Sequence, residues 1–233
     1  MDEKEHGISG GIYNKLQVDF AYNSNHIEGS RLTHDQTRYI FETHTIETEN
    51  GSAKVDDIIE TINHFKCFDV IIESYNEPLT EEYIKNLHKI LKTGTFSATS
   101  EEAVVGDYKK YPNEVGGLDT VEPESVMKAM KALLETYNNI ESISFDDLLD
   151  FHAKYEKIHP FYDGNGRTGR LILFKECLKN NIIPFIIADE YKYEYNRGLH
   201  EWQLGKEKGY LRDTCLFMQD YMKKVLDYFK IKY

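Results

Sequence analysis

Residues 159–170 read HPFYDGNGRTGR, and the rest of the chain is organised around this stretch. It combines one histidine, one aspartate, two arginines and three glycines. Apolar residues with helical spacing follow at Leu171, Phe174 and Leu178, so the stretch leads into a helix. Because the first N–H groups of a helix have no partners within it, they form a ready site for an anion. The sequence therefore predicts a nucleotide phosphate site at the start of a helix, with a histidine beside it.

Two side chains in this stretch suit catalysis and metal binding. His159 can act as a general base near neutral pH, and it precedes Pro160, so we expect its backbone to be extended rather than helical. Asp163 is a hard oxygen ligand for Mg²⁺, which binds through one or two carboxylates together with substrate phosphates.

The other polar residues of the stretch suit phosphate binding. Gly164 and Gly166 permit the close backbone approach of a phosphate-cradling loop, and Asn165 adds a side-chain N–H donor. Arg167 and Arg170 are three residues apart, so they are neighbours on one helix face and can each hold a phosphate. Each residue alone has an ordinary structural explanation, such as a cap, a turn or an ion pair. Their combination within twelve residues favours phosphoryl or nucleotidyl transfer.

Composition limits the classes of function. The 233 residues suit one large domain or one and a half. A net charge of −12 argues against broad binding to nucleic acid or to anionic membranes. The apolar runs are far shorter than the roughly 20 residues that span a bilayer. The first residues contain no apolar signal segment, and the three cysteines form no disulfide or zinc pattern. We expect a cytoplasmic protein that binds neither nucleic acid nor membrane.

Helical spacing recurs along most of the chain, and the predicted fold is all-α. The stretches with this pattern are residues 13–27, 33–42, 55–75, 80–91, 123–137, 144–158, 166–180, 189–199 and 217–228. Thr33, Ser144 and Asp189 are expected to cap the helices that follow them. On the buried stripe of 80–91, His88 is expected to be a core histidine rather than a ligand.

Residues 94–120 are the exception, because they are rich in glycine. Here Tyr108 to Val115 is predicted to form a short hairpin around Pro112 and Asn113. Such a segment before a catalytic loop suits a lid or a substrate clamp, and equally an inert surface loop.

Glu28 ends the helix predicted at 13–27, and a carboxylate is the wrong charge for a helix C-terminus. The unfavourable interaction amounts to about 0.3–1 kcal/mol, which a nearby cation would offset. From this fact alone, a solvated surface glutamate is the simpler interpretation.

The stretch 159–170 resembles the signature of the Fic (filamentation induced by cAMP) family, H-P-F-x-[D/E]-G-N-G-R-x-x-R, at every defined position. The resemblance extends over about residues 15–205 and implies a Fic-type helical bundle with a short β-hairpin flap at 106–118. It also implies transfer of AMP from ATP to a Ser, Thr or Tyr hydroxyl of a target protein. By this resemblance, His159 would deprotonate the target hydroxyl and Asp163 would hold Mg²⁺ between the α- and β-phosphates.

The same resemblance implies the contacts to ATP. The backbone of the motif glycines with Asn165 would form the anion hole, and the two arginines would hold the β- and γ-phosphates. Tyr195 would lie against the adenine with Gln203 nearby, and the flap would align the target by strand addition, with its end near the nucleotide. The full set is Gly164, Asn165, Gly166, Arg167, Thr168, Gly169, Arg170, Val115, Gly116, Gly117, Tyr195 and Gln203. Lys109 departs from the family, which often has arginine there.

Residues 24–29 read SNHIEG and resemble the Fic inhibitory motif, [S/T]-x-x-x-E-[G/N]. In the family this glutamate, here Glu28, pairs with the second motif arginine, here Arg170, and blocks productive placement of the γ-phosphate. Ser24 lies one turn earlier on the same helix face. The resemblance thus supplies the cation that Glu28 needs. It divides the chain into a flexible N-terminus at 1–11, an inhibitory helix region at 12–32 and a Fic core at 33–233.

The leading hypothesis is an autoinhibited, Mg²⁺-dependent protein adenylyltransferase that uses ATP and modifies a target protein or itself. Homodimer formation is a further expectation of the resemblance. The alternatives are removal of AMP from a modified target by a water that Glu28 orients, the use of another donor, a nucleotide-sensing interaction module with little turnover, and an all-α structural protein that binds no ATP.

Overall fold

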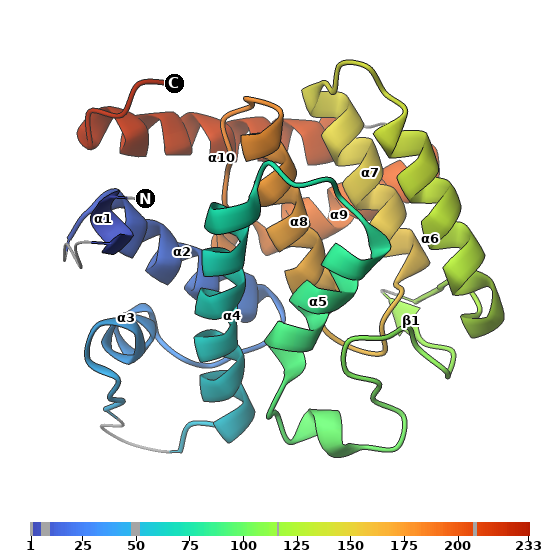
Figure 1. Cartoon of the computed structure of the whole chain (residues 1–233), viewed down its shortest axis with the longest axis horizontal. Helices are drawn as coiled ribbons and strands as arrows, with labels where there is room; N and C mark the ends of the chain where they lie inside the picture. Colours follow the sequence, from blue (N-terminus) through green and yellow to red (C-terminus); the bar gives the residue numbers. More distant parts are fainter. Residues whose placement is uncertain (1, 6–9, 48–51, 116, 207–208) are drawn as a thin grey trace.

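The computed structural model of the chain describes residues 2–5, 10–47, 52–115, 117–206 and 209–233 (Figure 1). Nearly all of its regular structure is helical, as the sequence predicted. The α-helices are α1 (Asp2–Glu5), α2 (Ile12–Ile27), α3 (His34–Thr43), α4 (Val55–Ser74), α5 (Glu81–Lys92), α6 (Pro123–Asn138), α7 (Phe145–Ile158), α8 (Asn165–Lys179), α9 (Lys192–Gln203) and α10 (Gly209–Tyr228). Two single-turn 3₁₀ helices are η1 (Ser97–Thr99) and η2 (Asp189–Tyr191).

Helix α8 occupies the middle of the bundle, where it contacts α2, α4, α5 and α7 (Figure 1). Residues 171–174 are apolar in succession and all of them are buried, so this part of α8 is covered on every side. The ring of Phe174 lies 5.2 Å from that of Phe20 on α2 and 5.4 Å from that of Phe68 on α4. The apolar half of α8 therefore fixes the polar start of the same helix relative to α2 and α4.

Two of the three predicted helix caps are confirmed. Thr33 and Ser144 each form a capping box with the residue three positions later. Asp189 does not cap α9. It begins η2 instead, and its Oδ2 lies 3.0 Å from Nδ1 of His26.

Helix α4 turns a polar face inward in its first half. Glu60, Asn63 and His64 are buried, whereas Val55 and Ile62, which the apolar pattern predicted to be buried, are 65% and 38% exposed. The apolar pattern predicts the buried face correctly only where that face meets other apolar side chains, as at Phe68. In the first half of α4 the buried face meets the charged residues at the start of α8.

The predicted hairpin is misplaced. Strands β1 (Glu114–Val115) and β2 (Leu118–Asp119) pair antiparallel over two residues each, so the turn follows residue 115 rather than lying at Pro112 and Asn113. Asn113 is held elsewhere, because its Nδ2 donates to the carbonyl of Phe161 at 3.0 Å. Gly116 lies outside the described residues. With pairing this short, the strand-adding flap stays a prediction.

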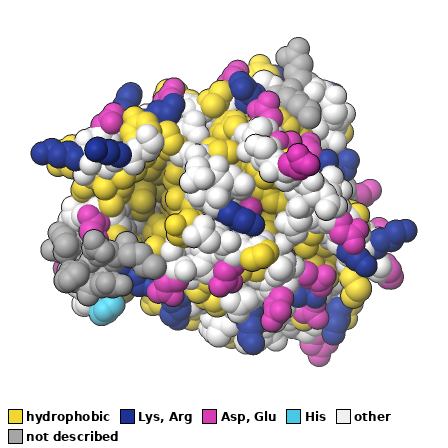
Figure 2. All heavy atoms as spheres, turned by 45° about the horizontal axis from the view of Figure 1, so that its top comes forward, with side chains coloured by type: hydrophobic (Ala, Val, Ile, Leu, Met, Phe, Trp, Pro, Cys, Tyr) yellow, Lys and Arg dark blue, Asp and Glu magenta, His cyan; other side chains and the backbone are white. Residues whose placement is uncertain are grey.

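The face of the molecule in Figure 2 carries acidic side chains interspersed with basic and apolar ones. Among the described residues, no helix has both the length and the apolar character that crossing a bilayer requires.

Candidate active site

The loop between α7 and α8 begins at His159, which ends α7 as its C-cap. Its φ of 51° and ψ of 62° are left-handed, so the expected extended backbone is wrong. The following proline disfavours only right-handed helical geometry, and the left-handed cap lets the N–H of His159 bond to the carbonyl of Tyr155 at 3.0 Å. The imidazole is thereby placed at the junction of the two helices.

His159 is a neutral imidazole at physiological pH. Burial lowers its pKa to about 4, and the nearby ammonium group of Lys109 acts in the same direction. A neutral ring can accept a proton, so the environment of His159 suits a general base.

Lys109 connects the segment before β1 to this loop. Its N–H donates to the carbonyl of Pro160 at 2.9 Å, and its buried Nζ donates to Asn113 Oδ1 and Thr120 Oγ1 at 2.7 and 2.6 Å. Burial lowers the pKa of Lys109 to about 8. Where the family often has an arginine, this chain has a lysine that holds the base of the hairpin against the motif loop.

Asn165 shapes the loop from within. Its Oδ1 accepts the N–H of Phe161 and its Nδ2 donates to the carbonyl of Phe161, both at 2.8 Å. The side chain thus fixes the backbone on either side, and its donation to an anion stays a prediction. The helix start then directs the main-chain N–H groups of Asn165 and Gly166 toward any anion bound there.

His88 joins the motif loop to the glycine-rich segment. Its Nδ1 accepts the N–H of Gly106 at 3.0 Å, which leaves Nε2 protonated to donate to the carbonyl of Asp163 at 3.0 Å. The ring of His88 also stacks on Phe161 with centroids 3.8 Å apart. The expected core histidine is confirmed, and it supports the loop from the side of α5.

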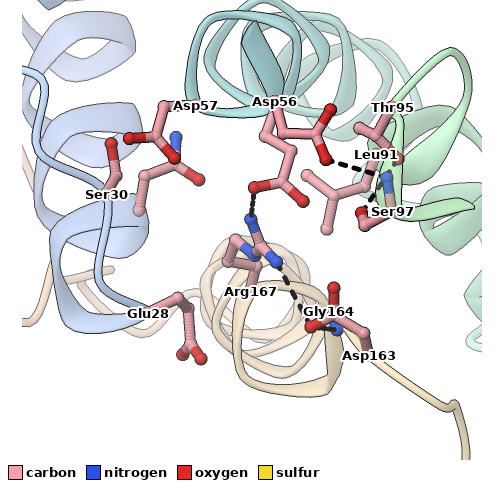
Figure 3. Close-up of polar contacts among 12 residues, drawn as sticks. Glu28, Ser30, Asp56, Asp57, Leu91, Thr95, Ser97, Asp163, Gly164 and Arg167 are labelled. Atoms are coloured by element: carbon pink, nitrogen blue, oxygen red, sulfur yellow. Dashed lines mark hydrogen bonds and ion pairs between the residues drawn. The ribbon is translucent and has the colours of Figure 1, made fainter. Parts of the chain in front are cut away.

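Four charged side chains meet beside the start of α8, and Figure 3 labels two of them, Asp163 and Arg167. Arg167 Nη1 donates to Glu60 Oε2 and its Nη2 lies 3.5 Å from Asp163 Oδ1. Lys92 Nζ lies 2.5 Å from both Glu60 Oε1 and Asp163 Oδ2. Burial alone would raise the pKa of Asp163, but Arg167 and Lys92 outweigh it and hold the pKa at about 2. The carboxylate of Asp163 is therefore ionised, as a metal ligand must be.

Glu28 reaches the same helix start from α2. Its Oε1 lies 2.7 Å from Arg170 Nη2, and Arg170 also donates from Nε to Ser24 Oγ at 3.1 Å and from Nη2 to the Ser24 carbonyl at 2.9 Å. A Cβ on Gly166 would lie only 2.3 Å from Glu28 Oε1. Burial alone would raise the pKa of Glu28, but Arg170 and Arg167 outweigh it and lower the pKa. The ionised carboxylate thus lies against the backbone where the sequence predicted an anion, and Figure 3 shows it beside α8.

Three residues predicted to contact ATP are packed within the helical bundle. Thr168 is fully buried and its Oγ1 donates to the Gly164 carbonyl at 2.9 Å, while a Cβ on Gly169 would meet Glu156 on α7 at 2.3 Å. Tyr195 is 1% exposed, with its hydroxyl 2.6 Å from His152 Nε2, and its contact with adenine stays a prediction.

The remaining predicted residues lie at the edges of the site. Gln203 ends α9, and its Nε2 donates to the carbonyl of Ala153 at 3.2 Å. Val115 and Gly117 flank the turn between β1 and β2. Their contacts with ATP stay predictions.

The segment that carries the motif loop is similar to a known protein family. The family model of the Fic/DOC family matches residues 78–176, which run from just before α5 into α8. This segment of the chain is therefore similar to the Fic/DOC family. The matched segment includes the whole motif loop and the base of the hairpin, whereas α2, with Glu28, and α4, with Glu60, lie before it.

Curated relatives of this chain are named protein adenylyltransferases. It is 25% identical over 198 residues to protein adenylyltransferase fic-1 of Caenorhabditis elegans, with 83% of this chain and 38% of the relative covered. It is 28% identical over 211 residues to protein adenylyltransferase Fic of Drosophila erecta, with 88% of this chain and 40% of the relative covered. The chain thus spans about two fifths of the length of these relatives.

Solved Fic structures share the fold. A Fic domain containing signaling protein from Bacteroides thetaiotaomicron gives a TM-score of 0.78 at 25% identity, covering 92% of this chain and 86% of that one. Fic-1 from C. elegans gives a TM-score of 0.77 at 20% identity, covering 99% and 67%. The second likeness shows the fold alone.

Two charged residues of the candidate site were not predicted from the sequence. Lys92 follows His88 by four residues on the buried stripe of α5, and Glu60 lies on the inward polar face of α4. The available signal for Lys92 was a lysine at a position where the helical pattern calls for a buried side chain. Glu60 gave no such signal, because the apolar pattern of α4 indicated another face.

Proposed function

We propose that this Fic domain is an autoinhibited protein adenylyltransferase that transfers AMP from ATP to a Ser, Thr or Tyr hydroxyl of a target protein or of itself. The observation that carries the proposal is the position of a neutral His159 beside the anion-binding start of α8, which the carboxylate of Glu28 covers. The names of the curated relatives support the reaction.

In the proposed reaction, His159 accepts the proton of the target hydroxyl. The hydroxyl oxygen then attacks the α-phosphorus of ATP, a new oxygen–phosphorus bond forms, and the bond to the leaving pyrophosphate breaks. The low pKa of His159 keeps the ring able to accept a proton across the physiological range. The N–H groups at the start of α8 and the guanidinium of Arg167 favour the negative charge on the phosphates.

Asp163 is the proposed ligand for Mg²⁺. Its side chain is 52% exposed and ionised, so it can contribute a carboxylate oxygen to an ion that arrives with the nucleotide. No group of three or more His, Cys, Asp or Glu residues suited to a metal occurs in the described part of the chain. This fits Mg²⁺, which is commonly held by one or two carboxylates and by substrate phosphates rather than by a protein cage. When bound, the ion would neutralise phosphate charge.

Glu28 is the proposed inhibitory residue. It engages Arg170, which the resemblance assigns to the γ-phosphate, and it lies on the backbone of Gly166. A phosphate and the Glu28 carboxylate are both anions, so they would compete for the same cation and the same N–H groups. Release of Glu28 would therefore permit the productive placement of ATP.

The test is incubation of the purified chain with labelled ATP, Mg²⁺ and a cell lysate. We expect label on protein with the Glu28→Gly variant, less with the unaltered chain, and none with Glu28→Gly combined with His159→Ala. Absence of label in every protein with a folded Glu28→Gly variant would refute the transferase. Release of AMP from a previously modified protein, lost on Glu28→Gly, would favour the hydrolytic alternative instead.

A further inference from the structure

Lys92 places its ammonium group on the carboxylate that is proposed to bind Mg²⁺. Its Nζ lies 2.5 Å from Asp163 Oδ2, within the distance of a charge-assisted hydrogen bond. Asp163 Oδ1 is occupied as well, by the N–H of Gly164 at 2.6 Å. A divalent ion that approached Oδ2 would meet the ammonium group at the same oxygen.

Lys92 cannot readily leave this position. The residue is only 4% exposed, and its three N–H groups have three acceptors: Asp163 Oδ2, Glu60 Oε1 at 2.5 Å and Ser97 Oγ at 3.1 Å. Glu60 is itself fixed from the other side by Arg167. Turning Lys92 away would leave Glu60 buried with one unpaired oxygen, which is costly.

The charges of this cluster are already balanced. Glu60 and Asp163 contribute two negative charges, and Lys92 and Arg167 contribute two positive ones. A cavity of about 190 Å³ beside Asp163 is lined by Lys92, Ser97 and Tyr162, so an ion has room to reach the carboxylate. Access is therefore available, but the charges of these four paired side chains sum to zero and offer a divalent cation no net attraction.

We propose that Lys92, held by Glu60, is a resident cation that competes with divalent metal for Asp163, so that metal binds only together with nucleotide phosphates. The phosphates would bring the additional negative charge that the cluster lacks. This inference rests on the proposed role of Asp163 as the metal ligand. It assigns Lys92 and Glu60 a part in metal selection at the site.

The test measures binding of Mn²⁺ without nucleotide, by the decrease of the free-ion signal in electron paramagnetic resonance. Removal of one adjacent cation changes the proton affinity of a carboxylate by about tenfold or more, and a divalent ion is repelled at least as strongly. We therefore expect Lys92→Met and Lys92→Gln to bind one Mn²⁺ about tenfold more tightly than the unaltered chain. Adding Asp163→Asn should abolish the gain.

Two controls keep the result decisive. Ser97→Ala removes a neutral partner of Lys92 and should leave Mn²⁺ binding unchanged. Lys92→Gln retains a donor for Glu60, so it keeps the test open if Lys92→Met unfolds. In the unaltered chain, the ammonium ¹⁵N signal of Lys92 should persist when Mg²⁺ alone is added.

Equal Mn²⁺ affinity in the unaltered chain and both folded Lys92 variants would overturn the inference. So would displacement of the ammonium signal by Mg²⁺ without nucleotide. Because the measurement involves no transfer of AMP, a failed transferase assay with an intact gain in metal binding would count only against the proposed function.

Discussion

Replacement of Glu28 by glycine removes the carboxylate that pairs with Arg170. Arg170 then keeps two contacts with Ser24, but it loses the charged acceptor at 2.7 Å. The start of α8 also loses the carboxylate that lies against Gly166. Both changes free groups that the proposed function assigns to phosphate, so we expect faster transfer of AMP.

The size of the effect follows from the exposure of the pair. A hydrogen bond between charged groups contributes about 1.5–3 kcal/mol. The Glu28 side chain is 33% exposed, so solvent screening favours the lower part of that range, about 1.5–2 kcal/mol. Because about 1.4 kcal/mol corresponds to a tenfold change in an equilibrium, the population able to bind ATP productively should rise about 10- to 30-fold.

The assay is the initial rate of AMP incorporation at saturating ATP and Mg²⁺. Glu28→Gln keeps the size and an oxygen acceptor but removes the charge, so its rate should lie between those of the unaltered chain and Glu28→Gly. Ser24→Ala is the matched control on the same helix, because it removes a contact of Arg170 without removing a charge. Its rate should rise less than that of Glu28→Gly.

The reasoning would be refuted by a Glu28→Gly variant that is folded, binds ATP and transfers AMP no faster than the unaltered chain. A Ser24→Ala variant as active as Glu28→Gly would also count against it, because the charge of Glu28 would then not be the cause.

Three further outcomes are expected. In the Glu28→Gly background, His159→Ala should lower the rate of AMP transfer by about 100-fold or more, because it removes the proposed general base. The ATP affinity measured by calorimetry should stay unchanged, because no phosphate contact is lost. Reduced ATP affinity would argue that His159 has a binding role. Burial and the charge of Lys109 together hold the pKa of His159 near 4, so Lys109→Met should raise this pKa. The acid limb of the pH–rate profile should then move to higher pH. An unmoved acid limb would refute the electrostatic effect of Lys109 on His159. Urea unfolding should show that the free energy of unfolding falls between pH 7 and pH 5 by about 2 kcal/mol less in His64→Phe than in the unaltered chain. An equal fall in the variant and the unaltered chain would contradict this prediction.

The sign of the last effect follows from the burial of His64. Burial lowers its pKa from 6.5 to about 3, and neither ring nitrogen has a hydrogen-bond partner among the described residues. The unfolded chain therefore takes up a proton below pH 6.5 that the folded chain refuses. Stability is complete above pH 6.5 and is lost progressively as the pH falls toward 3. A phenylalanine keeps the packing against Phe20, 4.9 Å away, without the titration.

The parts of the site that are local in sequence could be predicted. His159, Asp163 and Arg167 lie within nine residues, and the helix start that joins them follows from the pattern after Arg170. The helix-dipole argument indicated that Glu28 needs a cation. It could not name Arg170, because the two residues are 142 positions apart. The resemblance to the Fic inhibitory motif supplied that partner.

What failed depends on packing that is set far away in the chain. Glu60 and Lys92 come from two helices outside the motif, and no local pattern shows that their charges meet at Asp163. The hairpin was misplaced because Asn113 bonds to Phe161, 48 residues later. The burial of Tyr195 against His152, 43 residues earlier in the chain, is likewise a long-range contact that no local pattern indicates.

The order of α2 and α8 along the chain has a consequence for biosynthesis. Helix α2 is complete long before the ribosome adds Arg170, and the contact between them needs both the core that Phe20 and Phe174 share and the finished start of α8. Glu28 is therefore already present when the nucleotide site first forms. A newly made chain would fold directly into the form in which Glu28 contacts Arg170. It would not pass through an interval in which the proposed nucleotide site is complete, open and exposed to cellular ATP.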